Sequence, residues 1–403
     1  MTQVQAPPGP PAAGPAGPPA RSASLAPSAP PDRTVRVADR RSRGRLGPVV
    51  VGQLVVVELC AVAVYAALGG PAWLVGAVAV PAVALVAAAF ARRGGRWWYE
   101  DLLLRRRLRR RRGRARVAVH DGGPNDPRLA ALAPELTVIE LTERGTRLGI
   151  GQDGQGWFAA VALDPRPGAP AGSVDAAAVD RALAVLADFA APVSLVQVVS
   201  HTLVWYPAPG APPAAHRTVW AAVRLSVRDA RTEAVTRGGG MLGVHRTVAT
   251  AVGRLGKALN AAGLSHRVLG RDELRAAVVS ASGVDLASAP QAETWTGLRG
   301  GGWTQRCLAL RARPGVPWGA LVDAVTATSA PSHTLAAVVR PGARPAPLLR
   351  VAAPADHIEA LVKVVRDVAR RGGVPTRPLD GEHGPGVYAT APVALRLADL
   401  PTD

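Results

Sequence analysis

Apolar and polar residues separate most sharply between Leu46 and Ala91. Two apolar runs, 46–68 and 71–91, are joined by Gly69 and Gly70, and Glu58 is the one charged side chain of the stretch. Runs of this length form helices of about 30–35 Å, enough to cross the hydrocarbon core of a bilayer. Because the join is so short, the pattern predicts two antiparallel transmembrane helices. A buried hairpin of a soluble protein is the alternative, but core helices are seldom so long and so free of charge.

Arginines flank the hairpin on both sides. Residues 33–116 carry 18 arginines and four acidic residues, with no arginine in the Gly-Gly join. Basic residues near membrane helices stay on the cytoplasmic side, so both ends of the hairpin are expected in the cytoplasm and the protein in the inner (plasma) membrane. Arginines and interfacial aromatic rings would fix its depth against anionic lipid headgroups. The predicted anchors are Arg43, Arg45, Arg96, Trp97, Trp98 and Tyr99.

The segment 92–116 is predicted to form an interfacial helix. Three leucines precede an arginine run from Arg105 to Arg112, and Leu108 interrupts the run. This amphipathic pattern suits a helix on the inner leaflet. DNA or RNA binding by this run is the other interpretation. The run adjoins a membrane exit, and the segment 33–116 around it supplies +14 of the net charge of +19, so no nucleic-acid partner is expected.

Two polar residues inside the hairpin are candidates for contact with another membrane protein. Glu58 lies near the middle of its run, where an ionised side chain on an isolated helix costs several kcal/mol. Such a residue usually pairs, faces protein or is protonated. We therefore predict that Glu58 and Gln53 contact a partner's membrane helix, with a protonated Glu58 tolerated inside the hairpin as the alternative.

Beyond the basic segment, residues 117–403 show strands and helices in alternation, which predicts a mixed α/β cytoplasmic domain. Residues 1–45 are Pro- and Ala-rich, end in a basic collar, and are expected to be a disordered cytoplasmic tail. The tail after Gly372 is expected to dock loosely or fray. The tetrapeptide HRTV occurs twice, at 216–219 and 245–248, too short a match to establish duplication. Strands are predicted at 137–142, 146–151, 157–163, 193–204, 218–227, 265–269, 303–311, 333–339 and 348–351, and helices at 175–190, 242–261, 272–280, 318–328 and 355–371.

Motifs for catalysis or cofactor binding give little signal. Gly149, Gly151 and Gly154 fit G-x-G-x-x-G, but the next residues form a strand, whereas a phosphate site needs a helix there. The Arg237–Gly240 run precedes a helix and could cradle an anion, although a flexible connection is the simpler interpretation. The eight histidines and two cysteines show no metal-ligand spacing. No catalytic, cofactor-binding or metal-binding residue is predicted.

Several segments together resemble one family. The hairpin opening GQLVVVEL, the exit RGGRWWYEDLLLRRRLRRR, the segment TRLGIGQDGQGWFAAVAL and the segment WAAVRLSVRDARTEAVTRGGG are similar to EccE, a core membrane component of actinobacterial type VII (ESX) secretion systems. The resemblance implies a non-enzymatic subunit of an inner-membrane complex beside EccB, EccC and EccD, with EccC supplying the ATPase. It carries over no catalytic residue.

Two functions from different classes remain at this stage. The first is a structural subunit of a secretion complex, held by its hairpin and its cytoplasmic domain. The second is a membrane-anchored, transferase-like enzyme acting on a lipid-linked or nucleotide-activated substrate. The second predicts a polar pocket with convergent carboxylates, or an anion site near Arg237–Gly240, while a filled domain centre would count against it.

Overall fold

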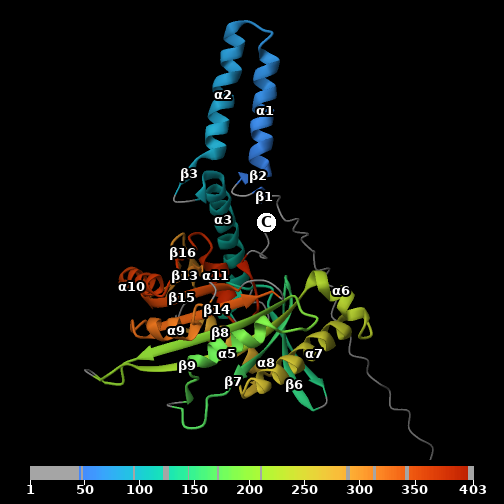
Figure 1. Cartoon of the computed structure of the whole chain (residues 1–403), viewed down its shortest axis with the longest axis vertical. Coiled ribbons are helices and arrows are strands. Elements are labelled where there is room, and N and C mark those ends of the chain that lie inside the picture. Colours follow the sequence, from blue (N-terminus) through green and yellow to red (C-terminus); the bar gives the residue numbers. More distant parts are fainter. Residues whose placement is uncertain are drawn as a thin grey trace, which may run out of the picture. The chain divides into compact units, whose positions relative to one another are not determined.

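The structure is a computed structural model, and it describes residues 45–46, 49–93, 96–120, 127–143, 145–169, 172–208, 211–286, 291–311, 315–340 and 345–397. The predicted tail and most of the collar, Arg43 included, lie outside these residues. Figure 1 shows the order of the elements along the chain.

The apolar stretch forms a helical hairpin, as predicted. Helix α1 (Val51–Ala67) and helix α2 (Ala72–Phe90) run antiparallel and are joined by a turn that contains Gly69 and Gly70. Short strands β1 (Arg45–Leu46) and β2 (Val49–Val50) precede α1. By length and composition, one described helix, α2, could cross a membrane; the apolar part of α1, Gly52–Ala67, is shorter.

The arginine run forms a long helix. Strands β3 (Arg92–Arg93) and β4 (Arg96–Trp97) pair with each other, and helix α3 (Trp98–His120) follows at once. Its Leu104 and Leu108 are buried and Leu102 is exposed. A helix is therefore present here, but it begins at Trp98 instead of residue 92 and extends four residues beyond the predicted end at 116. Its location at the membrane interface stays a prediction.

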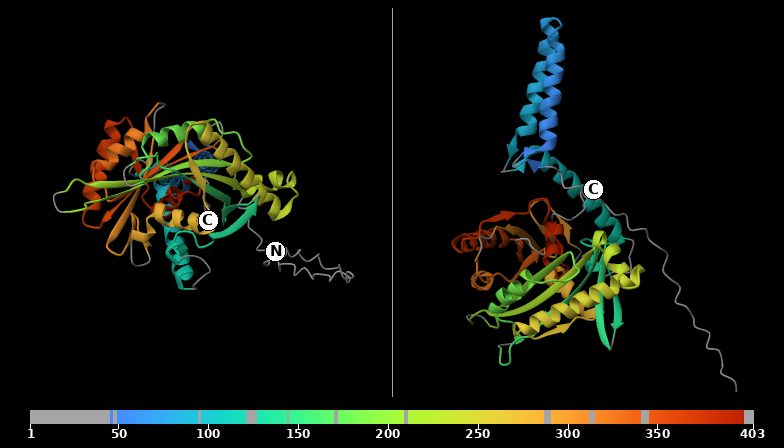
Figure 2. Two further views of the ribbon diagram at one scale, coloured as in Figure 1. Left: turned by 90° about the horizontal axis from the view of Figure 1, so that it is seen from below. Right: turned by 45° about the vertical axis from the view of Figure 1, so that its right-hand side comes forward.

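The remaining chain builds one antiparallel sheet of twelve described strands with helices on both faces (Figures 1 and 2). The α/β class is confirmed. The strands are β5 (Thr137–Glu143), β6 (Thr146–Asp153), β7 (Gly156–Leu163), β8 (Leu195–Trp205), β9 (Ala214–Ser226), β10 (His266–Val268), β11 (Ala292–Glu293), β12 (Leu298–Gly300), β13 (Trp303–Leu310), β14 (Ser332–Val339), β15 (Ala346–Pro354) and β16 (Thr376–Pro378). The helices are α4 (Pro127–Ala130), α5 (Ala177–Ala187), α6 (Val227–Val235), α7 (Gly240–Ala261), α8 (Arg271–Ser282), the 3-10 turn η2 (Val284–Leu286), α9 (Trp318–Thr326), α10 (Ile358–Arg371) and α11 (His383–Thr390).

The sheet consists of two copies of the same topology. The first copy runs β7-α5-β8-β9-α7-β10, and its strands lie in the order β10-β7-β9-β8. The second copy runs β13-α9-β14-β15-α10-β16, with the order β16-β13-β15-β14. Each is the βαββαβ arrangement of ferredoxin-like domains. The copies join where β8 pairs with β14, from Ser332 opposite Leu203 to Val339 opposite Val196.

Backbone contacts confirm that the copies correspond. The second helix of each ends in the same hydrogen bond, Leu264 N to Leu259 O in one and Val374 N to Ala369 O in the other. Just before these bonds lie Gly263 and Gly373, both with positive φ, as this type of helix end requires. The domain is thus a structural duplication. Neither HRTV match reflects it, because both fall within the first copy.

Two apolar layers hold the sheet. On one face, α5, α7, α9 and α10 pack on both copies through residues such as Leu183, Leu255, Leu321 and Val365. On the other face, α4, α8, α11 and the segment after α11 form a second layer, in which Leu274, Tyr388 and Leu395 are buried. The four helices of the first face are the equivalent helices of the two copies, so one continuous core spans the duplication.

The prediction for the tail after Gly372 was wrong. Strand β16 pairs with β13, and α11 is buried along its length. Beyond it, Val393 and Leu395 are also buried. The glycines and prolines there shape tight turns around buried residues rather than marking a loose end. The sequence also gave no warning of α6 or of the short strands β11 and β12.

Candidate functional site

The two predicted partner contacts in the hairpin lie on different sides of α1. Gln53 is 3% exposed, and its Nε2 donates a hydrogen bond to Ala89 O at 2.8 Å. It therefore ties the start of α1 to the end of α2. The side chain of Glu58 lies on the outer surface of the hairpin. The structure does not bring the two residues together, and only Glu58 faces outward.

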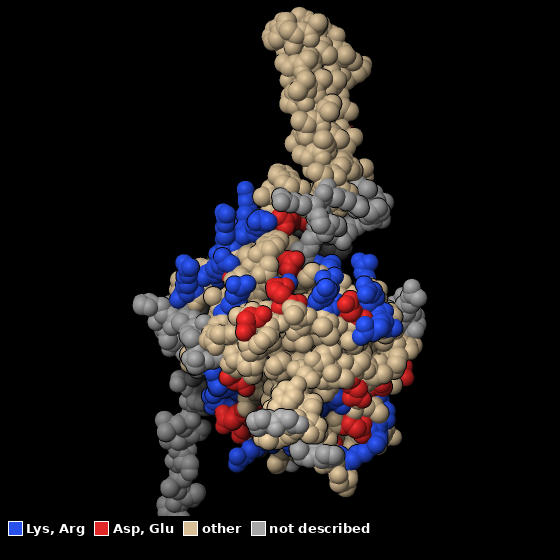
Figure 3. Space-filling model, turned by 90° about the vertical axis from the view of Figure 1, so that its left-hand side faces the viewer, with Lys and Arg blue, Asp and Glu red and all other residues tan. Residues whose placement is uncertain are grey.

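The hairpin leaves much apolar surface uncovered. Leu59, Val62, Tyr65, Trp73 and Val80 are each at least 60% exposed, and Figure 3 shows almost no charged atoms on the visible face of the hairpin. Soluble monomers rarely expose contiguous apolar surface on this scale. This surface therefore needs lipid or protein to cover it.

The predicted aromatic anchors gather where α2 gives way to α3. The Trp97 ring meets the Phe90 ring edge to face, with centroids 6.0 Å apart. Trp98, which begins α3, is 44% exposed, and Tyr99 is partly buried. Arg45 and Arg96 fall in β1 and β4. The aromatic cluster is present at the expected position; its contact with lipid stays a prediction.

Part of the arginine run binds the domain. Arg111 pairs with Glu293 through two hydrogen bonds of 2.9 and 3.1 Å, and Arg112 Nε donates to Glu293 O at 2.6 Å. Arg105 lies over the Trp295 ring, 4.6 Å from its centroid. Since β11 and the turn after it lie some 180 residues from α3 in the chain, sequence spacing could not reveal this contact.

A cavity of about 940 Å³ lies between α3 and the second face of the sheet. Its arginines come from α3, and four carboxylates also reach it. Buried apolar residues form its floor. The charged lining residues are Arg107, Arg110, Arg111, Arg112, Arg114, Arg116, Glu135, Asp153, Glu293 and Glu382; the apolar ones include Leu132, Leu136, Tyr388, Leu395 and Leu397.

A buried ion pair supports the cavity floor. Arg224 on β9 donates Nη1 and Nη2 to the two carboxylate oxygens of Asp153 at 2.7 and 2.8 Å, and its Nε donates to Val393 O at 2.7 Å. Tyr388 Oη donates to the same carboxylate at 2.8 Å. Burial alone would raise the pKa of Asp153, but the guanidinium and the hydrogen bonds, including one from Gln155 N, hold it below its ordinary value.

This pair explains two of the segments that carry the family resemblance. Asp153 lies in GQDGQGW and Arg224 in WAAVRLSVRD. Two glycines of β6 serve packing, because a Cβ on Gly149 would lie 2.5 Å from Gly270 O, and one on Gly151 would lie 2.2 Å from the Phe158 ring. The prediction that a strand instead of a helix follows G-x-G-x-x-G is confirmed, since β7 comes next and pairs antiparallel with β6.

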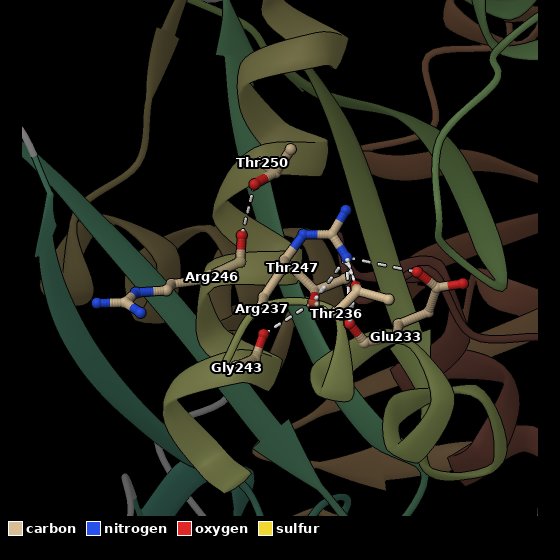
Figure 4. A network of polar contacts seen from close by, with 7 residues as sticks. All are labelled: Glu233, Thr236, Arg237, Gly243, Arg246, Thr247 and Thr250. Atoms are coloured by element: carbon tan, nitrogen blue, oxygen red, sulfur yellow. Dashed lines mark hydrogen bonds and ion pairs between the residues drawn. The ribbon is translucent and has the colours of Figure 1, made fainter. Parts of the chain in front are cut away.

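The Arg237–Gly240 run forms the turn between α6 and α7 (Figure 4). Gly238, Gly239 and Gly240 all have positive φ, which side-chain-bearing residues rarely adopt. Arg237 folds back and donates Nη1 to Glu233 O at 3.1 Å and to Thr236 Oγ1 at 3.1 Å. The arginine thus closes the turn upon its own helices instead of facing an anion, which favours the connecting role.

The centre of the sheet is filled by polar side chains. Arg350 is fully buried and donates to Gln305 Oε1 at 2.9 Å and to Thr334 Oγ1 at 2.7 Å, while His201 Nδ1 lies 3.3 Å from its Nη2. Burial lowers the pKa of Arg350 to about 10 and that of His333 to about 3. Hydroxyl and amide oxygens thus solvate the guanidinium, and the described residues leave no open polar site at this point.

Metal chemistry finds no support in the part of the chain that the structure describes, where no three candidate ligands cluster. The carboxylates at the cavity do not converge as an acid–base pair, because Asp153 is bound to Arg224 and Glu293 to Arg111. Two of the four carboxylates there, Asp153 and Glu293, serve ion pairs that hold elements together.

A family model described as "Putative type VII ESX secretion system translocon, EccE" covers residues 213–310, from the start of β9 to the end of β13. No curated protein matches the chain. The matched segment contains Arg224 and the Arg237–Gly240 turn, both part of the resemblance seen in the sequence. Over residues 213–310 the chain therefore matches a family described as a putative type VII ESX secretion system translocon, which supports the resemblance to EccE seen in its sequence.

Proposed function

We propose that this chain is a component of the type VII secretion translocon and acts as a non-catalytic structural subunit of the inner-membrane complex. The uncovered apolar surface of the hairpin carries this proposal. Both α1 and α2 would cross the bilayer, with the apolar residues that flank α1 completing its span, and both ends would face the cytoplasm. At roughly 25 cal/mol per Å² of apolar surface removed from water, burying that surface in lipid and protein gives a large driving force for insertion.

Glu58 would make the contact with a partner's membrane helix. Its side chain is outward, whereas Gln53 is satisfied within the hairpin by Ala89. An ionised carboxylate at the centre of a membrane helix costs about 2.5–3.5 kcal/mol on insertion scales, and more if it is isolated in lipid. A donor on a partner helix would remove much of that cost. The partners that the family resemblance suggests are EccB, EccC and EccD.

The cytoplasmic domain would act as a rigid support. Its two copies share one core and one sheet. The enzyme alternative predicted convergent carboxylates or an anion site at Arg237–Gly240; the paired carboxylates and the folded-back Arg237 support neither feature. We therefore assign the domain no reaction.

The test is copurification of the tagged full chain from membranes in mild detergent, with mass spectrometry of the bound proteins. The Glu58→Leu variant is expected to insert normally and to lose most of its bound partners. Val62→Leu, one turn further along the same helix face, is the matched control and should retain them. Unchanged copurification of Glu58→Leu would contradict the proposed contact, and loss of both variants from the membrane fraction would point to insertion instead.

A further inference from the structure

The cavity between α3 and the domain has the chemistry of an amphiphile site. Six arginines and four carboxylates reach it, and one of those carboxylates, Asp153, is already neutralised by Arg224 from outside the cavity. Arg107, Arg110, Arg111 and Arg114 recur at helical spacing, so they form one stripe along α3. The wall on this side is therefore strongly cationic.

Two of these arginines are able to bind an anion. Arg111 and Arg112 are bound to Glu293 and hold α3 in place. Arg110 and Arg116 are exposed, and within the described ranges no carboxylate lies at ion-pair distance from either. They can bind an anion without breaking an existing contact. Charge-assisted bonds from arginine to phosphate oxygens are about twice as strong as neutral ones.

The opposite side of the cavity is apolar. Leu136, Leu395 and Tyr388 are almost completely buried beneath it, and Leu132 and Leu397 are partly buried beside them. A volume of about 940 Å³ lies within the range of about 300–1,000 Å³ typical of small-ligand sites. An acyl chain fits such a floor, since it brings no hydrogen-bonding group that burial would leave unsatisfied.

An extended peptide fits less well. The edge strand β11 lines the cavity, and Arg112 already occupies the carbonyl of its Glu293. A peptide lying on the apolar floor would bury backbone N–H and C=O groups with few partners. The helix that supplies the arginines also follows closely on the apolar helix α2, which places the site in the chain next to the segment expected at the membrane.

We propose that this cavity binds an anionic phospholipid from the membrane, with its phosphate on Arg110 and Arg116 and an acyl chain on the floor around Leu136 and Leu395. The site does not depend on the proposed role in secretion. A bound lipid would add contacts between α3 and the domain, and so would couple the docking of α3 to the presence of acidic lipid.

The test uses the full chain in dodecyl maltoside with lysophosphatidylglycerol carrying a photoreactive acyl chain. Mass spectrometry maps the labelled peptides. We expect saturable labelling of the segments around Leu136 and Leu395, with an affinity at least tenfold higher than that of the lysophosphatidylcholine analogue. Labelling confined to the hairpin, or equal affinity for the two lipids, would overturn the proposal.

Two pairs of arginine variants test whether lipid binding depends on the arginines that line the cavity or on the total positive charge of α3. Arg110→Ala with Arg116→Ala should weaken labelling of the cavity about tenfold, which is about 1.4 kcal/mol. Arg106→Ala with Arg109→Ala removes the same charge from α3 outside the cavity lining and should leave labelling unchanged. Ala131→Trp should fill the cavity and abolish labelling while the thermal midpoint stays within a few degrees. Equal loss in the two arginine pairs, or displacement of the probe by an acidic peptide but not by phosphatidylglycerol, would refute the assignment.

Discussion

Breaking the Asp153–Arg224 pair should destabilise the domain strongly. Arg224 is 1% exposed and Asp153 9%, so either residue left alone would be a buried charge without its partner. Removing one member of such a pair costs about 3–5 kcal/mol. For a domain of this size, that corresponds to a fall of roughly 6–15 °C in the unfolding midpoint. We expect this fall for Asp153→Asn and for Arg224→Met.

The double variant tests the cause. If the loss comes from the uncompensated charge, Asp153→Asn with Arg224→Met should cost little more than the worse single variant, because neither charge remains. Thermal unfolding of the full chain in detergent, followed by tryptophan fluorescence, measures all three. Asp367→Asn, which breaks an exposed pair with Arg370, is the control and should shift the unfolding free energy by less than about 0.5 kcal/mol.

The pair also predicts a pH dependence with a definite sign. The folded pKa of Asp153 is below its ordinary value, so the unfolded chain takes up a proton first as the pH falls. The stabilisation that the ionised Asp153 contributes to the folded state is complete above its unfolded pKa of about 4. It is lost as the pH falls through the folded pKa. Additive single variants, small shifts, or the same acid sensitivity in Asp153→Asn would refute the reasoning.

Three further predictions concern one residue each. Glu293→Gln should weaken the docking of α3 and expose its arginines, so limited trypsin digestion should cut within residues 105–116 several times faster than in the wild type. Burial lowers the pKa of His333 to about 3, so below pH 6.5 the unfolded state takes up a proton that the folded state does not. Stability therefore falls from pH 6.5 towards pH 3. His333→Gln should flatten that decline, which unfolding midpoints measured across this pH range will show. Burial raises the pKa of the Cys307 thiol to about 12, and iodoacetamide at pH 8 should leave it unmodified until urea unfolds the domain.

Local patterns in the sequence were sufficient for most elements. The turn residues that bound 146–151 and 157–163 identified β6 and β7, and the run 242–261 identified α7. Helix α7 buries one stripe, which leaves a helical period in the sequence, whereas β7 is buried on both faces and is marked by a short apolar run between turns. Segment 383–390 has no such period, because α11 is buried all round, and its glycines and proline look like a loop.

Long-range contacts were beyond local patterns. Asp153 and Arg224 are 71 positions apart, and Arg111 and Glu293 are 182 apart. Nothing in either neighbourhood distinguishes these residues from solvent-exposed charges. The duplication was hidden for a similar reason: corresponding strands need only be apolar on matching faces, so their sequences can diverge while strand order and helix ends persist.

The junction between the two copies has a consequence for how such a domain can exist at all. One copy alone would present the outer edge of β8 or of β14, a row of unpaired backbone groups ready to pair with another chain. Two separate copies could satisfy that edge only as a symmetric dimer, whose population depends on protein concentration. Covalent linkage turns that dimer interface into the middle of a single sheet, so the sheet stays intact at any concentration of the protein.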